Sequence, residues 1–371
     1  DFRVRVALGD ETLTHQEWAE LLGAEDGLVL LRGQWVEVDR KKITEALEQW
    51  KAVESQAGDG VSFIEGMRLL AGAPKDLGDD ERADPERAWS FVTAGEWLGE
   101  LLANLRSPEQ LRQAVPGDEL KATLRPYQAA GVNWLWFLSS LGLGACLADD
   151  MGLGKTVQVL ALLTVLKRQG SGRPSLLVLP ASLLANWKAE MARFAPSLRP
   201  VFVHPSETPK EQLAAMASRP GAAMATADVV LTTYGMLLRQ PWLSEVDWRL
   251  VALDEAQAIK NPGSRQTKAV KRLRGEARIV LTGTPVENRL ADLWSLFDFL
   301  SPGLLGSQRQ FKDFVKRLES RSENRYAPLR NLVQPYILRR LKTDKRVIAD
   351  LPEKTEVRAF CGLGWGWGSS M

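Results

Sequence analysis

Cysteine and histidine are scarce in this chain, whose 371 residues include two of each. Two cysteines, Cys146 and Cys361, exclude a disulfide framework, and no group of cysteines and histidines has the spacing of a zinc site. Cys146 lies in an apolar stretch, where we expect it to pack as a small hydrophobic side chain. Sparse cysteine is typical of a reducing compartment, so we expect a cytoplasmic protein.

Long hydrophobic runs are also missing, because no apolar run approaches the roughly 20 residues of a membrane span. The chain begins with Asp1 and carries no signal peptide, so we expect a fragment of a longer protein. Its net charge of +2 is too small to indicate a nucleic-acid partner. Residues 321–358 hold ten basic and five acidic residues, which fits either a solvated helical face or a binding surface.

The first 115 residues predict a small mixed α/β region without a cluster of catalytic side chains. Phe2–Leu8 alternates in polarity and predicts a strand, and residues 28–38 predict a hairpin around Arg-Gly-Gln. Apolar spacing predicts a helix at Trp89–Leu105. Val115–Asp118, with its Pro-Gly pair, predicts the linker into the next domain.

From Leu124 onward, apolar strand patterns alternate with helical patterns. The predicted strands are Gly144–Ala148, Leu176–Leu179, Pro200–His204, Val229–Thr232, Leu250–Leu253 and Arg278–Thr282. The predicted helices are Ala129–Leu141, Lys155–Gln169, Leu183–Phe194, Lys210–Ala217, Gly235–Arg239, Ser264–Leu273 and Asn288–Leu300. This alternation predicts an α/β fold with a doubly wound parallel sheet and helices on both faces. Ligands should then gather at the carboxyl ends of the strands.

A glycine-containing turn follows the first of these strands, where residues 148–156 read Ala-Asp-Asp-Met-Gly-Leu-Gly-Lys-Thr. Gly152 and Gly154 would let the backbone approach a polyphosphate, and the next helix would direct its free N–H groups at the anion. Lys155 would reach the β- and γ-phosphates, and the Thr156 hydroxyl would bind Mg²⁺. Asp149 stands where the general phosphate-loop pattern has its first glycine. A Gly-Lys-Thr turn also arises by chance, so the motif needs support from elsewhere.

An acidic pair, Asp254-Glu255, follows the predicted strand Leu250–Leu253. A carboxylate at this position can hold Mg²⁺, and its neighbour can orient and deprotonate an attacking water. Acidic pairs are also common on surfaces, so the pair alone decides nothing. Together with a Gly-Lys-Thr turn about 100 residues upstream, it forms the usual division of a nucleoside-triphosphatase site.

The neighbouring blocks resemble the Swi/Snf-type ATPases, the DNA translocases of helicase superfamily two. The resemblance covers residues 124 to 356 and rests on six blocks in order. These blocks are Leu124–Gln128 (adenine contact), Leu147–Thr156 (motif I), Leu177–Trp187 (Ia), Val230–Tyr234 (Ib), Asp254–Gln257 (the Asp-Glu-Ala-Gln form of motif II) and Leu281–Asn288 (III). Ile337–Lys342 resembles the segment that leads towards a second lobe.

The resemblance implies a P-loop, RecA-like fold and assigns roles to individual residues. Candidate catalytic residues are Lys155, Asp254 and Glu255, with Thr156 and Asp254 as Mg²⁺ ligands. The implied ATP-binding residues are Gln128, Asp150, Met151, Gly152, Leu153, Gly154, Lys155 and Thr156. Candidate DNA contacts are Ser182, Asn186, Thr232 and Thr233, and Thr282, Gly283 and Thr284 would couple the γ-phosphate to the DNA side. Contacts of this kind would bind DNA phosphates and carry little sequence preference.

The resemblance also divides the chain. Residues 1–115 resemble an accessory region of bacterial members, 116–300 the first RecA-like lobe and 301–360 a mostly helical segment leading to a second lobe. Residues 361–371 read as a non-native or disordered tail. In this family arginine fingers come from the second lobe, and such a residue is worth about 10³–10⁵ in rate. We therefore expect this chain to bind ATP and Mg²⁺ but to hydrolyse slowly or not at all.

The resemblance implies a parent protein that hydrolyses ATP in response to DNA, moves on duplex DNA and remodels protein–DNA complexes. Its partners would be duplex DNA and a DNA-bound complex such as RNA polymerase or repair factors, at the bacterial nucleoid. Two alternatives stay open. One is a strand-separating helicase of the same superfamily, and the other is a nucleotide-gated binding module without hydrolysis.

Overall fold

The computed structural model describes residues 2–8, 11–12, 27–31, 34–38, 63–70, 90–94, 114, 116–170, 172–283, 290–319 and 325–344. Thr284, the remainder of the predicted helix beyond residue 94 and the predicted tail 361–371 lie outside these residues. The described helices include none that is both long and apolar enough to cross a membrane.

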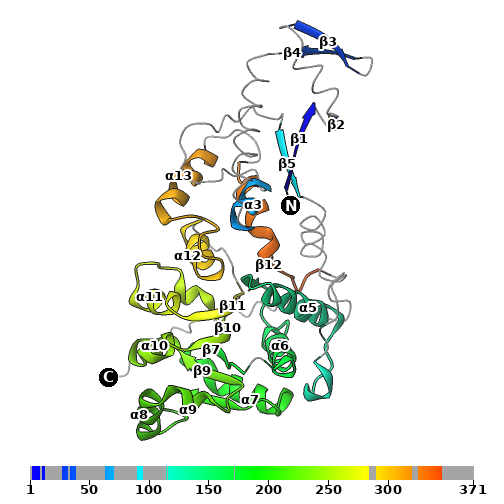
Figure 1. The fold of residues 1–371 in the computed structure, drawn as a ribbon. Coiled ribbons are helices and arrows are strands. Elements are labelled where there is room, and N and C mark those ends of the chain that lie inside the picture. The colour runs from blue at the N-terminus through cyan, green and yellow to red at the C-terminus, as the bar shows by residue number, and fades with distance from the viewer. Residues whose placement is uncertain are drawn as a thin grey trace, which may run out of the picture.

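A seven-stranded sheet forms the centre of the molecule, and every pair of neighbouring strands in it is parallel (Figure 1). The strand order is β12-β6-β11-β10-β7-β9-β8. The strands are β6 (Ala145–Leu147), β7 (Ser175–Leu179), β8 (Pro200–Val203), β9 (Val229–Thr233), β10 (Asp247–Leu253), β11 (Arg274–Leu281) and β12 (Ile337–Leu338). The predicted α/β fold with a parallel sheet is therefore confirmed.

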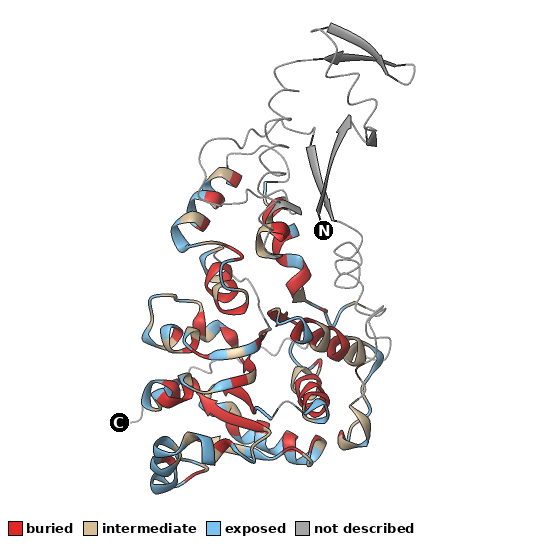
Figure 2. Cartoon of the chain, in the orientation of Figure 1, coloured by how far each residue is buried: buried red, intermediate tan, exposed pale blue. Residues whose placement is uncertain are grey.

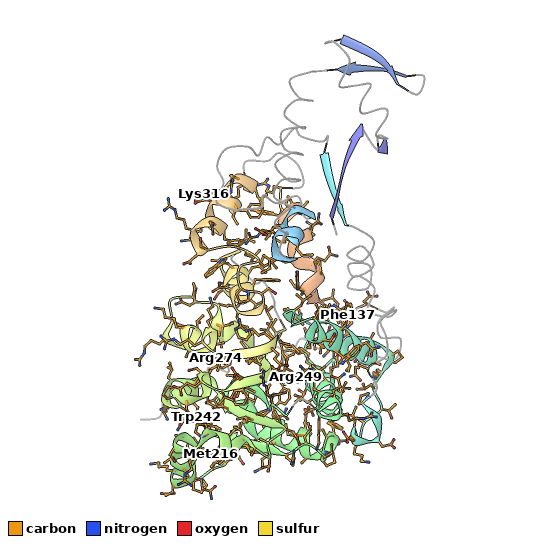
Figure 3. The ribbon with its side chains drawn as sticks, viewed as in Figure 1. Phe137, Met216, Trp242, Arg249, Arg274 and Lys316 are labelled. Atoms are coloured by element: carbon orange, nitrogen blue, oxygen red, sulfur yellow. The ribbon has the colours of Figure 1, made fainter. Side chains whose placement is uncertain are left out.

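Each strand contributes to two cores because successive side chains point to opposite faces of the sheet. In β7, Leu177 and Leu179 belong to one core, whereas Leu176 and Val178 belong to the other. Figure 2 shows buried residues on the sheet and on the helix faces that cover it. Figure 3 places Phe137 of α5 on one side and Trp242 on the other. Because both faces are covered, the strands are nearly continuous apolar runs rather than alternating ones.

Helices cover both faces, and most begin and end within a few residues of the predicted bounds. They are α5 (Pro126–Ser140), α6 (Lys155–Gln169), α7 (Leu184–Phe194), α8 (Lys210–Ser218), α9 (Pro220–Met224), α10 (Tyr234–Arg239), α11 (Arg265–Lys271), α12 (Leu290–Leu300), α13 (Gln308–Glu319) and α14 (Ala327–Val333). Helix α6 lies between two left-handed glycines, Gly154 with φ 76° and Gly170 with φ 65°. Helix α5 begins earlier than predicted, because Pro126 occupies its first turn, where the missing N–H costs nothing.

Strand β12 was not predicted from the sequence. It follows the short helix η6 (Gln334–Tyr336) and pairs with β6 at the edge of the sheet, with Ile337 opposite Cys146 and Leu338 opposite Leu147. Two residues are too few to show a strand pattern, and the partner strand lies far upstream. The chain therefore returns to the first strand of the domain near the end of the described region.

In the N-terminal region, β1 (Phe2–Leu8) and the hairpin β3–β4 (Gly27–Leu31, Gln34–Val38) confirm the predictions. The predicted helix at Trp89–Leu105 is wrong at its start. Residues Ser90–Ala94 form β5, which pairs antiparallel with β1. The sequence Ser-Phe-Val-Thr-Ala contains aromatic and β-branched residues that favour a strand. The helical prediction came from the spacing of the apolar residues that follow it in the sequence. Strand β2 (Glu11–Thr12) pairs antiparallel with β1 on the side away from β5, and helix α3 (Phe63–Leu70) is also described in this region.

Asp228, which directly precedes β9 at the amino edge of the sheet, forms ion pairs with Arg199 and Lys167. Asp228 accepts hydrogen bonds from Arg199 at 2.9 and 3.0 Å and lies 3.1 Å from the Lys167 ammonium. Burial alone would raise the pKa of Asp228, but the hydrogen bonds from Arg199 and Lys167 lower it to about 2. A depressed carboxyl pKa stabilises the folded state above pH about 4, and this contribution is lost as the pH falls towards 2.

We therefore expect Asp228→Asn to lower Tm by about 2 °C at pH 7, because Arg199 is exposed and water screens the pair. Calorimetry between pH 7 and pH 2.5 should show the difference from the wild type shrinking below pH 4. Asp247→Asn, at an exposed aspartate that begins β10, is the matched control and should show no such trend. A Tm difference that is constant over this range would contradict the assignment.

Candidate nucleotide site

The predicted motifs meet at one edge of the sheet, at the carboxyl ends of its central strands. In the register, Leu253 of β10 pairs with Val280 of β11, and Leu281 of β11 pairs with Leu147 of β6. The three strands therefore end at the same edge. The loop after β6, the acidic pair after β10 and Thr282 after β11 meet there, as the parallel topology requires.

The loop between β6 and α6 has the backbone of a phosphate cradle. Gly152 has φ 83° and Gly154 has φ 76°, which is the left-handed region where a Cβ is unfavourable. A Cβ on Gly154 would also lie 2.4 Å from Gln128 Nε2, so any larger residue there would displace the Gln128 side chain. Lys155 and Thr156 form the first turn of α6, whose free N–H groups face this loop.

The Lys155 ammonium folds back onto the loop that it follows. Its Nζ donates to the carbonyl oxygens of Asp149 at 2.6 Å and Asp150 at 3.3 Å. Burial lowers the pKa of Lys155, and the negative charges of Asp149, Glu255, Asp254 and Asp150 oppose this shift. Lys155 and the Asp254–Glu255 pair are therefore close enough to interact electrostatically, although about 100 residues separate them.

Asp254 is held by two aromatic residues that the sequence analysis did not assign to the site. Trp187 of α7 donates its indole N–H to Asp254 Oδ2 at 2.7 Å, and the Tyr234 hydroxyl donates to the Asp254 carbonyl at 2.7 Å. The Glu255 backbone N–H donates to Oδ1 at 2.9 Å. Burial raises the pKa of Asp254, and the Trp187 hydrogen bond acts against this shift. These donors fix the orientation of a carboxylate that is 8% exposed.

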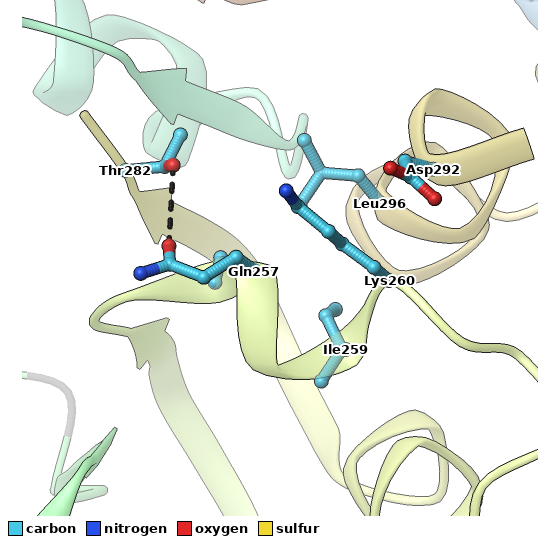
Figure 4. A pocket seen from close by; sticks show the side chains of 7 residues that line it. Gln257, Ile259, Lys260, Thr282, Asp292 and Leu296 are labelled. Atoms are coloured by element: carbon cyan, nitrogen blue, oxygen red, sulfur yellow. Dashed lines mark hydrogen bonds between the residues drawn. The ribbon is translucent and has the colours of Figure 1, made fainter. Parts of the chain in front are cut away.

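Glu255 is the one non-glycine residue with positive φ among the described residues, at φ 48° and ψ 56°. Such a conformation costs of the order of 1 kcal/mol or more and is common at functional sites. The Glu255 carboxylate accepts from Gln257 Nε2 at 2.5 Å, and Thr282 Oγ1 donates to Gln257 Oε1 at 3.5 Å. Figure 4 shows this contact beside a small cleft between η5 (Ala256–Ile259) and α12. A single glutamine thus links motif II to Thr282.

Gln128 contacts the phosphate loop directly. Its Nε2 donates to the Leu153 carbonyl at 3.2 Å, and its Oε1 accepts from the Arg125 backbone N–H at 2.9 Å. The Tyr127 hydroxyl donates to the same Leu153 carbonyl at 3.2 Å. The residue expected to contact adenine therefore lies beside the loop expected to hold the phosphates.

The four predicted DNA contacts differ in exposure. Ser182, in the short helix η3 (Ala181–Leu183), and Asn186, in the first turn of α7, are exposed. Thr232 is completely buried and donates to the Val203 carbonyl at 3.0 Å. Thr233 is 5% exposed, and its hydroxyl caps α10 by accepting from the Met236 N–H at 3.3 Å. The geometry thus favours Ser182 and Asn186 over the two threonines, whose hydroxyls are already used within the fold.

The residues present fit a magnesium nucleotide. The cradle has two glycines in the left-handed region, where a Cβ is unfavourable, and the Trp187 indole N–H orients the Asp254 carboxylate. Mg²⁺ in such sites is held by one or two carboxylates plus water and phosphate oxygens, so Asp254 with the Thr156 hydroxyl is a sufficient donor set. The excess of carboxylates over Lys155 also favours a divalent cation.

Replacement of Trp187 by Phe tests the role of its hydrogen bond. The variant keeps the aromatic packing but loses the donor that holds Asp254, which also raises the pKa of that carboxyl further. We expect Mg²⁺-dependent binding of a fluorescent ADP analogue to weaken about tenfold, with a smaller change when Mg²⁺ is replaced by EDTA. Trp242→Phe is the matched control, since Trp242 lies in η4 (Pro241–Ser244) and donates its indole N–H to Gln240, outside the site. Equal affinities in the two variants would contradict this role.

Comparisons with known proteins agree with this geometry. A family model described as the SNF2-related domain matches residues 127–365, and one described as SNF2 Helicase protein matches residues 1–71. The ATP-dependent helicase/translocase YwqA of Bacillus subtilis is 40% identical over 98% of this chain and 39% of its own length. The TATA-binding protein-associated factor mot1 of Aspergillus fumigatus is 39% identical over 65% of this chain and 14% of its own.

Among solved structures, the Sulfolobus solfataricus SWI2/SNF2 ATPase core in complex with dsDNA superimposes with a TM-score of 0.58 and 43% identity. That match covers 66% of this chain and 49% of the Sulfolobus chain. The chain thus spans less than two fifths of the length of the curated relatives named above. The RecA-like α/β fold is confirmed by this similarity. The chain belongs to the Swi/Snf-type family of helicase superfamily two, and residues 127–365 are its SNF2-related domain.

Proposed function

We propose that this chain carries the ATP-binding lobe of a DNA-dependent ATPase that translocates on duplex DNA and remodels protein–DNA complexes. The observation that carries the proposal is the meeting of Lys155, Asp254 and Glu255 at one edge of the sheet, beside a glycine cradle. Family membership supports ATP as the nucleotide.

Each side chain of the site has a separate role in the proposed phosphoryl transfer. The cradle at residues 152–156 binds the phosphates through its N–H groups, and Lys155 leaves the loop carbonyls to reach the β- and γ-phosphates. Glu255 orients the attacking water and accepts its proton. Asp254 and the Thr156 hydroxyl would hold Mg²⁺, which would supply positive charge against the phosphates. Gln128 contributes its amide to the adenine edge.

Motif Ia and motif II are joined through the helix that carries the exposed DNA-contact candidates. Ser182 lies in η3, directly before α7, and Asn186 lies in the first turn of α7. Trp187, the residue after Asn186, donates its indole N–H to Asp254. A DNA backbone at this helix would therefore act on the Mg²⁺ ligand through one side chain. Thr282 is linked to Glu255 through Gln257, and Thr282, Gly283 and Thr284 are proposed to carry the coupling to the γ-phosphate.

The proposed substrate is a protein bound to duplex DNA, such as RNA polymerase or a repair complex at the nucleoid of the cytoplasm. The names of the relatives support this, since one is a TATA-binding protein-associated factor and one solved structure is a complex with dsDNA. Arginine fingers for hydrolysis would come from a second lobe after residue 360. We accordingly propose that 1–115, 116–300 and 301–360 are the accessory region, the first lobe and the connecting segment.

ATPase measurements with and without duplex DNA test this function. They should be made on this chain and on a longer chain extended to the length of its relatives. We expect DNA-stimulated hydrolysis in the longer chain and little in the shorter one. Absence of any DNA stimulation in the longer chain would reject the translocase proposal, and strand separation of a forked duplex would favour the helicase alternative. Nucleotide-dependent DNA binding without turnover in both chains would favour the binding module, and its affinity should fall steeply with salt.

A further inference from the structure

The segment at the end of the described chain, residues 337–342, lies along the phosphate loop and is called here the strap. The Ala148 N–H donates to the Leu338 carbonyl at 2.7 Å, and the Asp150 N–H donates to the Arg340 carbonyl at 3.1 Å. In return, the Lys342 N–H donates to Asp150 Oδ2 at 3.0 Å. The strap thus extends the pairing of β12 with β6 past the end of the sheet and into the loop.

One side chain of the strap, Arg340, is buried under that loop. Its Nε donates to Asp149 Oδ1 at 2.9 Å, and its backbone N–H donates to the same oxygen at 3.1 Å. Its Nη2 donates to Asp149 Oδ2 and, at 2.8 Å, to Gln158 Oε1, and its Nη1 donates to the Tyr127 carbonyl. Arg340 is 9% exposed and Asp149 is completely buried. All three guanidinium nitrogens therefore donate hydrogen bonds within this network.

This network fixes both ends of the phosphate loop. Asp149 begins the loop, and Gln158, which bridges Arg340 and Asp149, also donates to the Gly154 carbonyl at its other end, at 3.2 Å. There is no spare room around it, because a Cβ on Gly131 would lie 2.0 Å from Gln158 Oε1 and 2.7 Å from Arg340 Nη2. Asp149 replaces the usual first glycine of a phosphate loop, and its partner lies 191 residues away in sequence.

The network also reaches Lys155. The carbonyl of Asp149 accepts the Lys155 ammonium at 2.6 Å, while the carboxylate of the same residue is paired with Arg340. A buried carboxylate that loses its cationic partner must move towards water or become protonated, since an unpaired buried charge is unfavourable. Withdrawal of Arg340 would therefore shift the residue that positions Lys155.

From these contacts we propose that Arg340 is a positioning residue for the nucleotide site, and that docking of the strap sets the conformation of the phosphate loop. The nucleotide part of this inference rests on the proposed function. The strap is the segment through which the chain continues towards the proposed second lobe, so movement of that lobe acts directly on the loop that binds phosphate. The contact between Arg340 of the strap and Asp149 of the phosphate loop is then the link between the two segments.

The test compares two neighbouring substitutions, Arg340→Lys and Arg339→Lys. Both keep the charge, but Arg339 is exposed, whereas lysine at 340 cannot reproduce the fork that holds Asp149 and Gln158. With a fluorescent ADP analogue and Mg²⁺, we expect Arg340→Lys to weaken binding about tenfold and Arg339→Lys to leave it within about twofold. Asp149→Asn should weaken binding to a similar degree, and the double variant Asp149→Asn/Arg340→Lys should be little worse than either single one. Unchanged affinity in Arg340→Lys, or fully additive losses, would overturn the proposal.

Hydrogen exchange without nucleotide separates this inference from the function on which it rests. In Arg340→Lys, amides of residues 149–155 should exchange at least about tenfold faster than in Arg339→Lys, while amides of β10 keep their wild-type rates. A uniform increase across both segments would indicate a merely structural residue and would overturn the proposal. If the wild type binds no nucleotide, the proposed function fails, yet the exchange result still decides whether the strap holds the loop.

Discussion

Lys155→Ala will remove nucleotide binding and hydrolysis together. The Lys155 ammonium is the cation that meets the loop carbonyls at 2.6 and 3.3 Å and lies in the field of Asp254 and Glu255. Without it, the phosphates of a bound nucleotide would face three carboxylates, at Asp150, Asp254 and Glu255, with Mg²⁺ as the main counter-charge. Loss of a single donor to a developing oxyanion costs about 10²–10³ in rate, and here ground-state binding is lost as well.

We expect titration of Lys155→Ala with the fluorescent ADP analogue to show at least a hundredfold loss of affinity. Steady-state hydrolysis in the longer, DNA-stimulated chain should fall to background. Lys210→Ala, at an exposed lysine that begins α8, is the control and should leave both unchanged. Near-normal binding by Lys155→Ala would reject the phosphate-loop assignment, and with it the location of the site.

Much of the fold could be predicted because the local pattern and the tertiary environment agree. Strands such as β7 and β10 are apolar runs because both faces of a parallel sheet are covered, and turn residues mark their ends. The prediction was wrong at Ser90–Ala94, where a strand is stabilised by pairing with β1 and the residues after it continue an apolar spacing. Strand β12 could not be predicted, since its pairing with β6 depends on a partner about 190 residues away.

The candidate site residues proposed from the sequence are those that lie in contiguous motifs. Lys155, Asp254 and Glu255 were identified because each follows a strand, and parallel strands place their carboxyl ends at one edge. Trp187 and Arg340 were not proposed as site residues, because neither belongs to a motif that indicates its partner. The tryptophans have the spacing of core residues, and Trp187 is indeed buried. Its indole N–H nevertheless donates a hydrogen bond to Asp254, which the spacing does not reveal. Nothing in the sequence around Arg340 indicates that Asp149 is its partner.

Glu255→Gln will separate binding from turnover. Glutamine keeps the size of the side chain and an oxygen that can accept from Gln257, so the contact at 2.5 Å and the strained backbone at φ 48° can both persist. What is lost is the base that accepts a proton from the attacking water, which is worth about 10²–10⁴ in rate. We therefore expect hydrolysis in the longer chain to fall by at least about a hundredfold while affinity for the ADP analogue with Mg²⁺ stays within about twofold.

This pattern is opposite to that of Lys155→Ala, and the contrast is what makes the pair informative. A change that lowers the rate without weakening binding removes an interaction made in the transition state, whereas a loss of both removes the phosphate contact itself. Glu245→Gln, at an exposed glutamate that precedes β10, controls for the loss of one negative charge away from the site. Substantial DNA-stimulated turnover by Glu255→Gln would mean that another group activates the water. The unusual backbone at residue 255 would then serve only to present Asp254, whose carboxylate accepts the Glu255 N–H at 2.9 Å.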